Sequence, residues 1–325
     1  QRILTTAYRR TGIETRHTLF DGPESETRFP PAILRDDAGP TTGDRMQLYA
    51  QHAGALAHDA CAMALHHATI SPEAITHLIS VSCTGFIAPG VDVQLIHALG
   101  LPAGTPRTAI GFMGCHGALN GLRIARALVD ADPSAVVLMC CVELCSLHFA
   151  YGWNPERIVA NALFADGAGA VIVAGPDAPV HAPAAAWTIV SDATEILPDT
   201  TDPMSWTIGD HGFEMTLSPT VPDRIHNALP SFLTRWLGDD IDIAAINAWA
   251  VHPGGPRILD AVEASLELPP AALDISRTIL RTCGNVSSVT LLLILHAMTD
   301  ANVAGPLLML AFGPGLTIEA AHLTR

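Results

Sequence analysis

A cysteine between glycines is the residue best placed to act as a nucleophile in this 325-residue chain. Cys115 stands in residues 111–118 (GFMGCHGA), where an apolar strand-like run ends and a helical pattern begins. A thiol at a helix N-terminus faces the positive end of the backbone dipole, so its pKa should fall and its thiolate should be populated. Flanking glycines would let a substrate carbonyl approach the sulfur closely. A small cysteine buried in a tight turn is the alternative, and this segment alone does not decide between the two.

Two more polar residues stand in similar settings later in the chain. His252, in residues 250–257 (AVHPGGPR), ends an apolar strand pattern, and Asn285, in residues 283–288 (CGNVSS), precedes a helical pattern. Functional groups of α/β sheets gather beyond the carboxyl ends of strands, although a lone histidine is more often structural and an Asn-Ser pair is often a plain helix cap. Together, one Cys, one His and one Asn, each expected at a strand-to-helix junction, form a specific pattern.

A fourth motif lies near the end of the chain. Residues 311–317 read AFGPGLT, and their Gly313, Pro314 and Gly315 are expected to form a sharp loop against the active site.

The elements that would position these residues alternate between strands and helices. Strands are predicted at 78–83, 108–113, 135–142 and 168–173, with helices at 91–99 and 116–129. After a Pro- and Ala-rich connector at 175–185, strands are predicted at 187–193, 244–251 and 307–312, with helices at 222–237, 257–266 and 287–298. This alternation predicts an α/β protein, and its restart predicts a duplicated fold with halves at 1–175 and 176–325.

Composition excludes several classes of function. The net charge of −15 argues against a nucleic-acid-binding surface, and all 17 basic residues are arginine, which excludes a catalytic or Schiff-base lysine. No apolar run reaches the roughly 18–20 residues of a membrane span. Seven cysteines without a CxxC pair predict reduced thiols, a cytoplasmic location and no metal site.

Taken as a set, these motifs resemble those of the type III polyketide synthases, the chalcone synthase superfamily. Residues 161–168 (NALFADGA) are similar to the family segment that contains a gatekeeper Phe. The resemblance implies a thiolase-like duplicated αβαβα layered fold and a Cys115–His252–Asn285 triad. It implies iterative decarboxylative condensation of malonyl-CoA onto a Cys-bound acyl starter, then cyclisation to a pyrone or phenolic product. It also implies a homodimer that needs CoA thioesters as substrates and no cofactor.

The resemblance further assigns residues to the pocket. Phe164 and Met215 correspond to gatekeepers, and the pocket wall would include Cys83, Thr84, Glu143, Cys145, His148 and Ser287. Arg10 and Arg257 are the candidates for binding CoA. Because His148 replaces a small hydroxyl residue of plant members, a bulky or fatty acyl starter is favoured over chalcone synthesis, and a malonyl-only product stays open.

Two other functions compete with this interpretation. A β-ketoacyl-ACP synthase III-like enzyme would share the triad but condense once, and it would carry His-Gln-Ala-Asn and Gly-Asn-Thr-Ser contexts in place of HPGG and GNVSS. A non-catalytic acyl-CoA-binding protein of the same fold is the alternative from another class.

Overall fold

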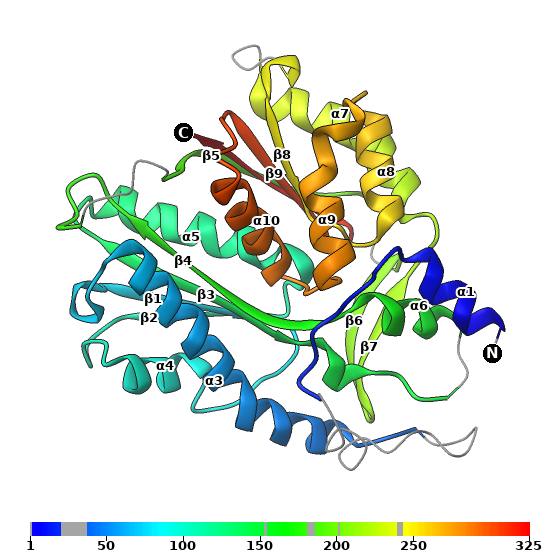
Figure 1. Ribbon diagram of the computed structural model, residues 1–325, viewed down its shortest axis with the longest axis horizontal. Helices are drawn as coiled ribbons and strands as arrows, with labels where there is room; N and C mark the ends of the chain where they lie inside the picture. Colours follow the sequence, from blue (N-terminus) through cyan, green and yellow to red (C-terminus); the bar gives the residue numbers. More distant parts are fainter. Residues whose placement is uncertain (1, 21–37, 153–154, 181–185, 201, 239–242) are drawn as a thin grey trace.

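The computed structural model describes residues 2–20, 38–152, 155–180, 186–200, 202–238 and 243–325 (Figure 1). In the first half, the helices are α1 (Arg2–Arg10), α3 (Thr42–Ala68), α4 (Val91–Leu99), α5 (Gly117–Ala131) and α6 (Pro155–Leu163), and the strands are β1 (His77–Ser82), β2 (Arg107–Gly111), β3 (Val136–Leu144) and β4 (Asp166–Ala174). In the second half, the strands are β5 (Thr188–Ile196), β6 (Met204–Gly209), β7 (Gly212–Leu217), β8 (Ala248–Val251), β9 (Leu307–Gly313) and β10 (Thr317–Thr324), and the helices are α7 (Val221–Leu237), α8 (Pro256–Ser265), α9 (Asp274–Cys283) and α10 (Val289–Asp300).

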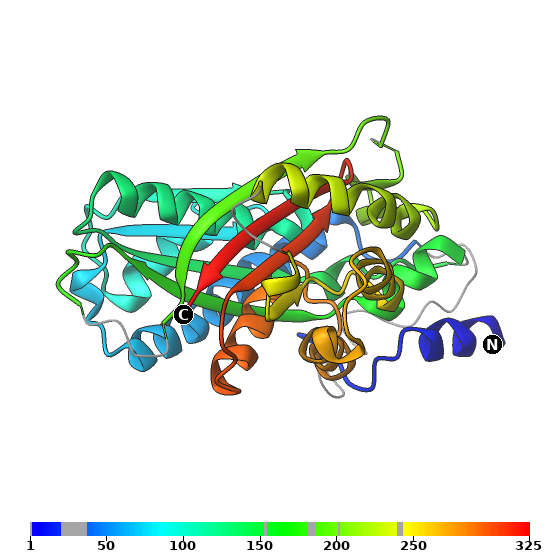
Figure 2. The same cartoon turned by 90° about the horizontal axis from the view of Figure 1, so that it is seen from above.

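Two four-stranded sheets form the frame of the molecule. The first has the order β2-β1-β3-β4, with β1 parallel to both neighbours and β4 antiparallel to β3. The second has the order β5-β10-β9-β8, with β8 parallel to β9 and the remaining pairs antiparallel. Figure 2 shows the strands of the second sheet side by side, running from β5 through β10 to β8. A separate hairpin is formed by β6 and β7.

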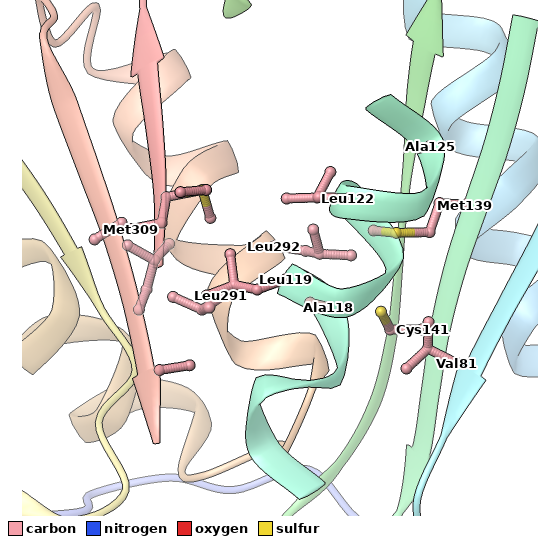
Figure 3. Packing of buried hydrophobic residues seen from close by; sticks show 14 of the residues in the cluster. Val81, Ala118, Leu119, Leu122, Ala125, Met139, Cys141, Leu291, Leu292 and Met309 are labelled. Atoms are coloured by element: carbon pink, nitrogen blue, oxygen red, sulfur yellow. The ribbon is translucent and has the colours of Figure 1, made fainter. Parts of the chain in front are cut away.

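Helices cover both faces of each sheet, which gives five layers. Alternate residues of a strand point to opposite faces, so Leu138 of β3 packs under α3 and α4 while Met139 packs against α5 and α10. Figure 3 shows this central layer, in which Leu122 of α5 and Leu292 of α10 lie between the strands of the two sheets. On the far side, α7 and α8 cover the second sheet. This arrangement is the predicted αβαβα order.

Local sequence explains the central and outer helices. α10 (VTLLLILHAMTD) is apolar on nearly all sides, as expected of a helix buried between two sheets. α3 begins at a capping box in which Thr41 and Asp44 exchange hydrogen bonds. Its buried face consists mainly of small residues such as Ala53, Ala57 and Cys61, so the buried and exposed faces of the helix differ little in hydrophobicity.

Several predicted elements are corrected by the structure. The segment predicted as a strand at 244–251 begins with a 3₁₀ turn, and only Ala248–Val251 pair as a strand. Asn285 lies between α9 and α10, so its expected strand-to-helix junction is wrong. Helices α1, α3, α6 and α9 and strands β6, β7 and β10 were not predicted, and residues 181–185 of the predicted connector lie outside the described residues.

No helix among the described residues is both long and apolar enough to cross a membrane. Within the same ranges, no group of three or more His, Cys, Asp or Glu side chains is placed to hold a metal ion.

Candidate active site

Cys115 lies in a tight turn between β2 and α5. Phe112 and Gly114 have positive φ angles of 62° and 78°, and residues Gly114–His116 form a 3₁₀ turn before α5 begins. A Cβ atom on Gly114 would lie 2.3 Å from Cδ of Pro314, so only glycine lets the loop of the FGPG motif approach so closely. The turn that holds Cys115, in the first half, therefore lies next to the FGPG loop of the second half. This is the position predicted for that loop.

The environment of the Cys115 thiol differs from the sequence prediction. Burial raises its pKa to about 12, the polar side chains of Ser287 and Asn285 near the sulfur oppose this effect, and the negative charge of Glu143 adds to it. This shift is opposite in direction to the one expected from the dipole of α5, whose first residue follows Cys115 by two positions.

His252 follows the last residue of β8 and is only 1% exposed. Its backbone N–H donates to Leu310 O of β9 at 2.8 Å, which fixes the residue to the edge of the second sheet. Among the described residues, neither ring nitrogen has a hydrogen-bond partner. Burial, and to a smaller degree the charge of His116, lowers the pKa of His252 to about 3. Burial therefore favours the neutral form of this imidazole.

Asn285 is held by the backbone on both sides of Phe164. Its N–H donates to Leu163 O, and its carbonyl accepts from the N–H of Ala165, each at 2.9 Å. Its side-chain Oδ1 accepts from the N–H of Ser287 at 2.8 Å, which directs the amide and leaves Nδ2 buried without a partner in the described part of the chain. Because buried donors normally find partners, such a group indicates a place where a ligand atom binds.

A cavity of about 880 Å³ lies next to Phe164. Four predicted pocket residues line it, namely Cys145, His148, Phe164 and Met215. Others line it too, and sequence reasoning did not identify them: Arg16, Phe149, Tyr151, Arg157, Ile158, Trp206 and Phe213. The triad residues, Cys83, Thr84, Glu143 and Ser287 do not line it. Phe164 lines this cavity, while its neighbours Leu163 and Ala165 hold the backbone of Asn285, and its role as a gatekeeper stays a prediction.

Comparison with known proteins identifies the family. Residues 5–177 match the N-terminal domain and residues 188–325 the C-terminal domain of the chalcone and stilbene synthases. The chain is 31% identical over 320 residues to the alpha-pyrone synthesis polyketide synthase-like Pks18 of Mycobacterium tuberculosis, covering 96% of this chain and 79% of that protein. The chain belongs to the chalcone and stilbene synthase family. It is a type III polyketide synthase and hence an acyltransferase, which favours this function over the two alternatives.

Solved structures agree with this assignment of the synthase. A polyketide synthase of the brown alga Ectocarpus siliculosus superposes with a TM-score of 0.89 at 28% identity, covering 100% of this chain and 89% of that one. The 1,3,6,8-tetrahydroxynaphthalene synthase of Streptomyces coelicolor A3(2) gives a TM-score of 0.86 at 27% identity, with 99% and 89% covered. The thiolase-like layered fold predicted for the synthase is confirmed.

Glu143 of the synthase is fully buried behind the nucleophile turn. Its Oε2 accepts from the N–H of Cys83 at 2.9 Å and from Thr84 Oγ1 at 2.8 Å, and its Oε1 accepts from Ser288 Oγ at 2.5 Å. Burial raises the pKa of this carboxyl, and the three donors partly offset the increase. Glu143, Cys83 and Thr84 therefore form a network behind the cavity wall, and Ser288, which sequence reasoning missed, completes it.

His148 forms part of the cavity wall and has both ring nitrogens occupied. Nδ1 accepts the N–H of Phe213 at 2.9 Å, so Nε2 must carry the proton that it donates to Thr84 O at 2.7 Å. Its ring stacks on that of Phe213 with centroids 4.1 Å apart. Burial lowers the pKa of His148 to about 4, so this residue is a fixed, neutral part of the wall.

The arginines predicted to bind CoA lie outside the cavity. Arg10 and Arg257 are exposed, and neither lines it. Arg16 lines it instead and donates through NH1 to Asn161 O at 2.6 Å and to Phe164 O at 2.9 Å. Arg157 also lines the cavity and pairs with Glu214 at 2.6 Å. No local motif indicates Arg16, because its contacts join residues 145 and 148 positions apart.

Proposed function

We propose that Cys115, His252 and Asn285 are the catalytic residues of this type III polyketide synthase. The observation that carries the proposal is a set of three buried polar atoms without partners among the described residues: both ring nitrogens of His252 and Nδ2 of Asn285. Buried groups of this kind are costly unless a ligand completes them. An enolate or thioester oxygen would accept from such donors, as in an oxyanion hole.

The neutral forms of Cys115 and His252, which burial favours, set the first step. As the sulfur of Cys115 attacks the acyl-CoA thioester carbon, its proton passes to a ring nitrogen of His252. The C–S bond to CoA breaks, and CoA leaves as a thiolate that takes a proton from solvent. The starter is then held on Cys115 as a thioester, and the positive charge on His252 faces the reaction centre.

Malonyl-CoA supplies the extension unit. Its carboxylate leaves as CO₂, and the electron pair of the broken C–C bond forms an enolate whose oxygen accepts hydrogen bonds from His252 and Asn285. The enolate carbon attacks the thioester carbon on Cys115, a C–C bond forms, and the cysteine sulfur leaves as a thiolate beside His252. Transfer of the lengthened chain back to the sulfur allows another round, and cyclisation ends the sequence.

The starter that we propose is a bulky or fatty acyl group. In support, the cavity holds about 880 Å³ and its wall includes Phe149, Ile158, Trp206 and Phe213. We also propose that Arg16 or Arg157 faces the CoA phosphates at the cavity. Arg10 and Arg257 would then not be the only arginines that bind CoA. The division into halves at 175/176, the cytoplasmic location and independence from any cofactor belong to this proposal as well.

The experiment is mass spectrometry of products from the full chain with malonyl-CoA, alone and with acyl-CoA starters from acetyl to palmitoyl. We expect pyrone or phenolic products with several added two-carbon units from long-chain starters, and none from Cys115→Ala. Polyketide synthesis by Cys115→Ala would refute the nucleophile. A preference for malonyl-CoA alone would refute the fatty acyl starter, and a single condensation that needs an acyl carrier protein would refute the iterative reaction.

A further inference from the structure

His116 directly follows Cys115 and anchors the turn that holds it. It is 2% exposed and occupies the N-cap position of α5, yet no side chain caps this helix start. Instead, its Nδ1 lies 2.7 Å from Oδ1 of Asn120, one helical turn further on. The start of α5 is thus fixed by a side-chain contact of His116 rather than by a cap.

The direction of this hydrogen bond follows from the next contact. Asn120 Nδ2 donates at 2.9 Å to Oε1 of Glu319, and a carboxylate can only accept. The oxygen of the Asn120 amide must therefore face His116, and His116 Nδ1 must carry the proton that it donates. Glu319 is fixed in turn by donors from Arg123 and from Thr194, the latter at 2.8 Å.

This chain of contacts joins the two halves of the molecule. His116, Asn120 and Arg123 belong to the nucleophile turn and α5, whereas Glu319 and Thr194 belong to the second sheet. Packing reinforces the link, because a Cβ on Gly313 would lie 2.2 Å from Cδ2 of His116. The ring of His116 is therefore set between the nucleophile turn and the FGPG loop, and it cannot turn without losing Asn120.

We propose that His116 is a positioning residue for Cys115, acting through the Nδ1–H that Asn120 and Glu319 hold in place. The inference rests on the proposed role of Cys115 as nucleophile. The side chain of His116 is held by Asn120 and packed against Gly313, so it acts on the thiol through the backbone of the turn. Its loss should lower kcat and the reactivity of the Cys115 thiol together and leave the KM for malonyl-CoA nearly unchanged.

Three substitutions of His116 separate this role from simple packing. The amide nitrogen of His116→Asn lies near the place of Nδ1 and can donate to Asn120, whereas that of His116→Gln lies near the place of Nε2 and cannot. His116→Leu removes both. We expect kcat and the rate of Cys115 alkylation by iodoacetamide to fall about tenfold or more in the Gln and Leu variants and to stay within about threefold in the Asn variant.

Asn120→Leu and Thr194→Val complete the design. Asn120→Leu should reproduce His116→Leu, and the double variant should be no slower than either single one, because both break one link. Thr194→Val removes a different donor to Glu319 and should have little effect.

Circular dichroism melts verify that each variant is folded at the assay temperature. If a Leu variant unfolds, the comparison of His116→Asn with His116→Gln tests the proposal. Equal rates for the Asn and Gln variants, or additive losses in the double variant, would overturn the proposal. Activity of Cys115→Ala would instead overturn the proposed function on which it rests.

Discussion

At the scale of single residues, burial favours the neutral forms of the Cys115 thiol and the His252 imidazole. It is the largest cause of both shifts, raising the pKa of Cys115 to about 12 and lowering that of His252 to about 3. A helix dipole alone would lower the pKa of the thiol, but desolvation of the sulfur acts in the opposite direction. Charge separation must then come with the substrate, whose developing negative charge faces His252 and Asn285.

This predicts a particular pH dependence for alkylation of Cys115 in the free synthase. Because the folded pKa lies above the ordinary value of 9.0, the thiolate fraction should be small at neutral pH and rise about tenfold per pH unit. Iodoacetamide labelling, read at Cys115 by peptide mass spectrometry with Cys115→Ala as the blank, measures this rate. A rate that levels off near neutral pH would show that an ion pair with His252 already exists.

Residue-level prediction relied on local signals. Each triad member carries its own motif, and Phe164 lies in a recognisable segment, so all four could be named from the sequence, and their roles stay predictions. The contact between Asn120 and Glu319 joins residues 199 positions apart, and nothing near either residue in the sequence indicates it. Pairings of this kind depend on how the two sheets stack, which a single sequence does not specify.

At the scale of elements, loops from both halves meet at the nucleophile turn, and glycine is what permits the contact. Gly313 and Gly315 stand two positions apart in the FGPG loop but face different surroundings. A Cβ at Gly313 meets the ring of His116, whereas a Cβ at Gly315 meets nothing within 4 Å, although its φ of 69° favours glycine. The first position is therefore limited by packing and the second only by backbone conformation.

Alanine substitutions at these two glycines should accordingly differ in activity more than in stability. Each should cost roughly 1–3 kcal/mol of unfolding free energy, through overpacking at residue 313 and a left-handed φ at residue 315. Gly313→Ala should also lower kcat about tenfold or more by displacing His116, while Gly315→Ala should keep kcat within about threefold. Urea unfolding and steady-state product formation measure the two effects, and equal kcat values would show that the His116 contact does not matter.

Elements were predicted from the pattern of apolar and polar residues and from glycines at their ends. α4 was predicted at its observed bounds, Val91–Leu99, because Gly90 and Gly100 mark its ends. α3 escaped prediction because the middle of its buried face consists of Ala53, Gly54, Ala57 and Cys61, with large apolar residues only at Tyr49 and Leu65. The β6–β7 hairpin, which supplies Trp206 and Phe213 to the cavity wall, was missed although apolar residues stand at every second position of both strands, MSWTIG and GFEMTL.

At the scale of the whole molecule, one edge of the first sheet lies next to the nucleophile turn. β2 is the edge strand, and its backbone leads directly into that turn. Phe86 and Met113, which flank this edge, are 48% and 39% exposed, high values for large apolar side chains. An exposed strand edge with apolar neighbours is a surface that a second copy can cover symmetrically. We therefore propose that the homodimer forms across β2, which would tie each active site to the interface.

A charge placed at Phe86 tests this arrangement. In Phe86→Asp, an unpaired carboxylate would be buried on association, so we expect the dissociation constant of the dimer to rise at least about a hundredfold and monomer to predominate in light scattering at micromolar concentration. Ile196→Asp is the matched control, because Ile196 is 71% exposed on β5, in the other sheet. It should leave the dimer intact. The ring of Phe86 packs against that of Phe112, at the start of the nucleophile turn, with centroids 5.4 Å apart. A change at Phe86 therefore reaches this turn, and kcat should fall in the same variant. A dimeric Phe86→Asp, or a dimer broken only by Ile196→Asp, would place the interface elsewhere.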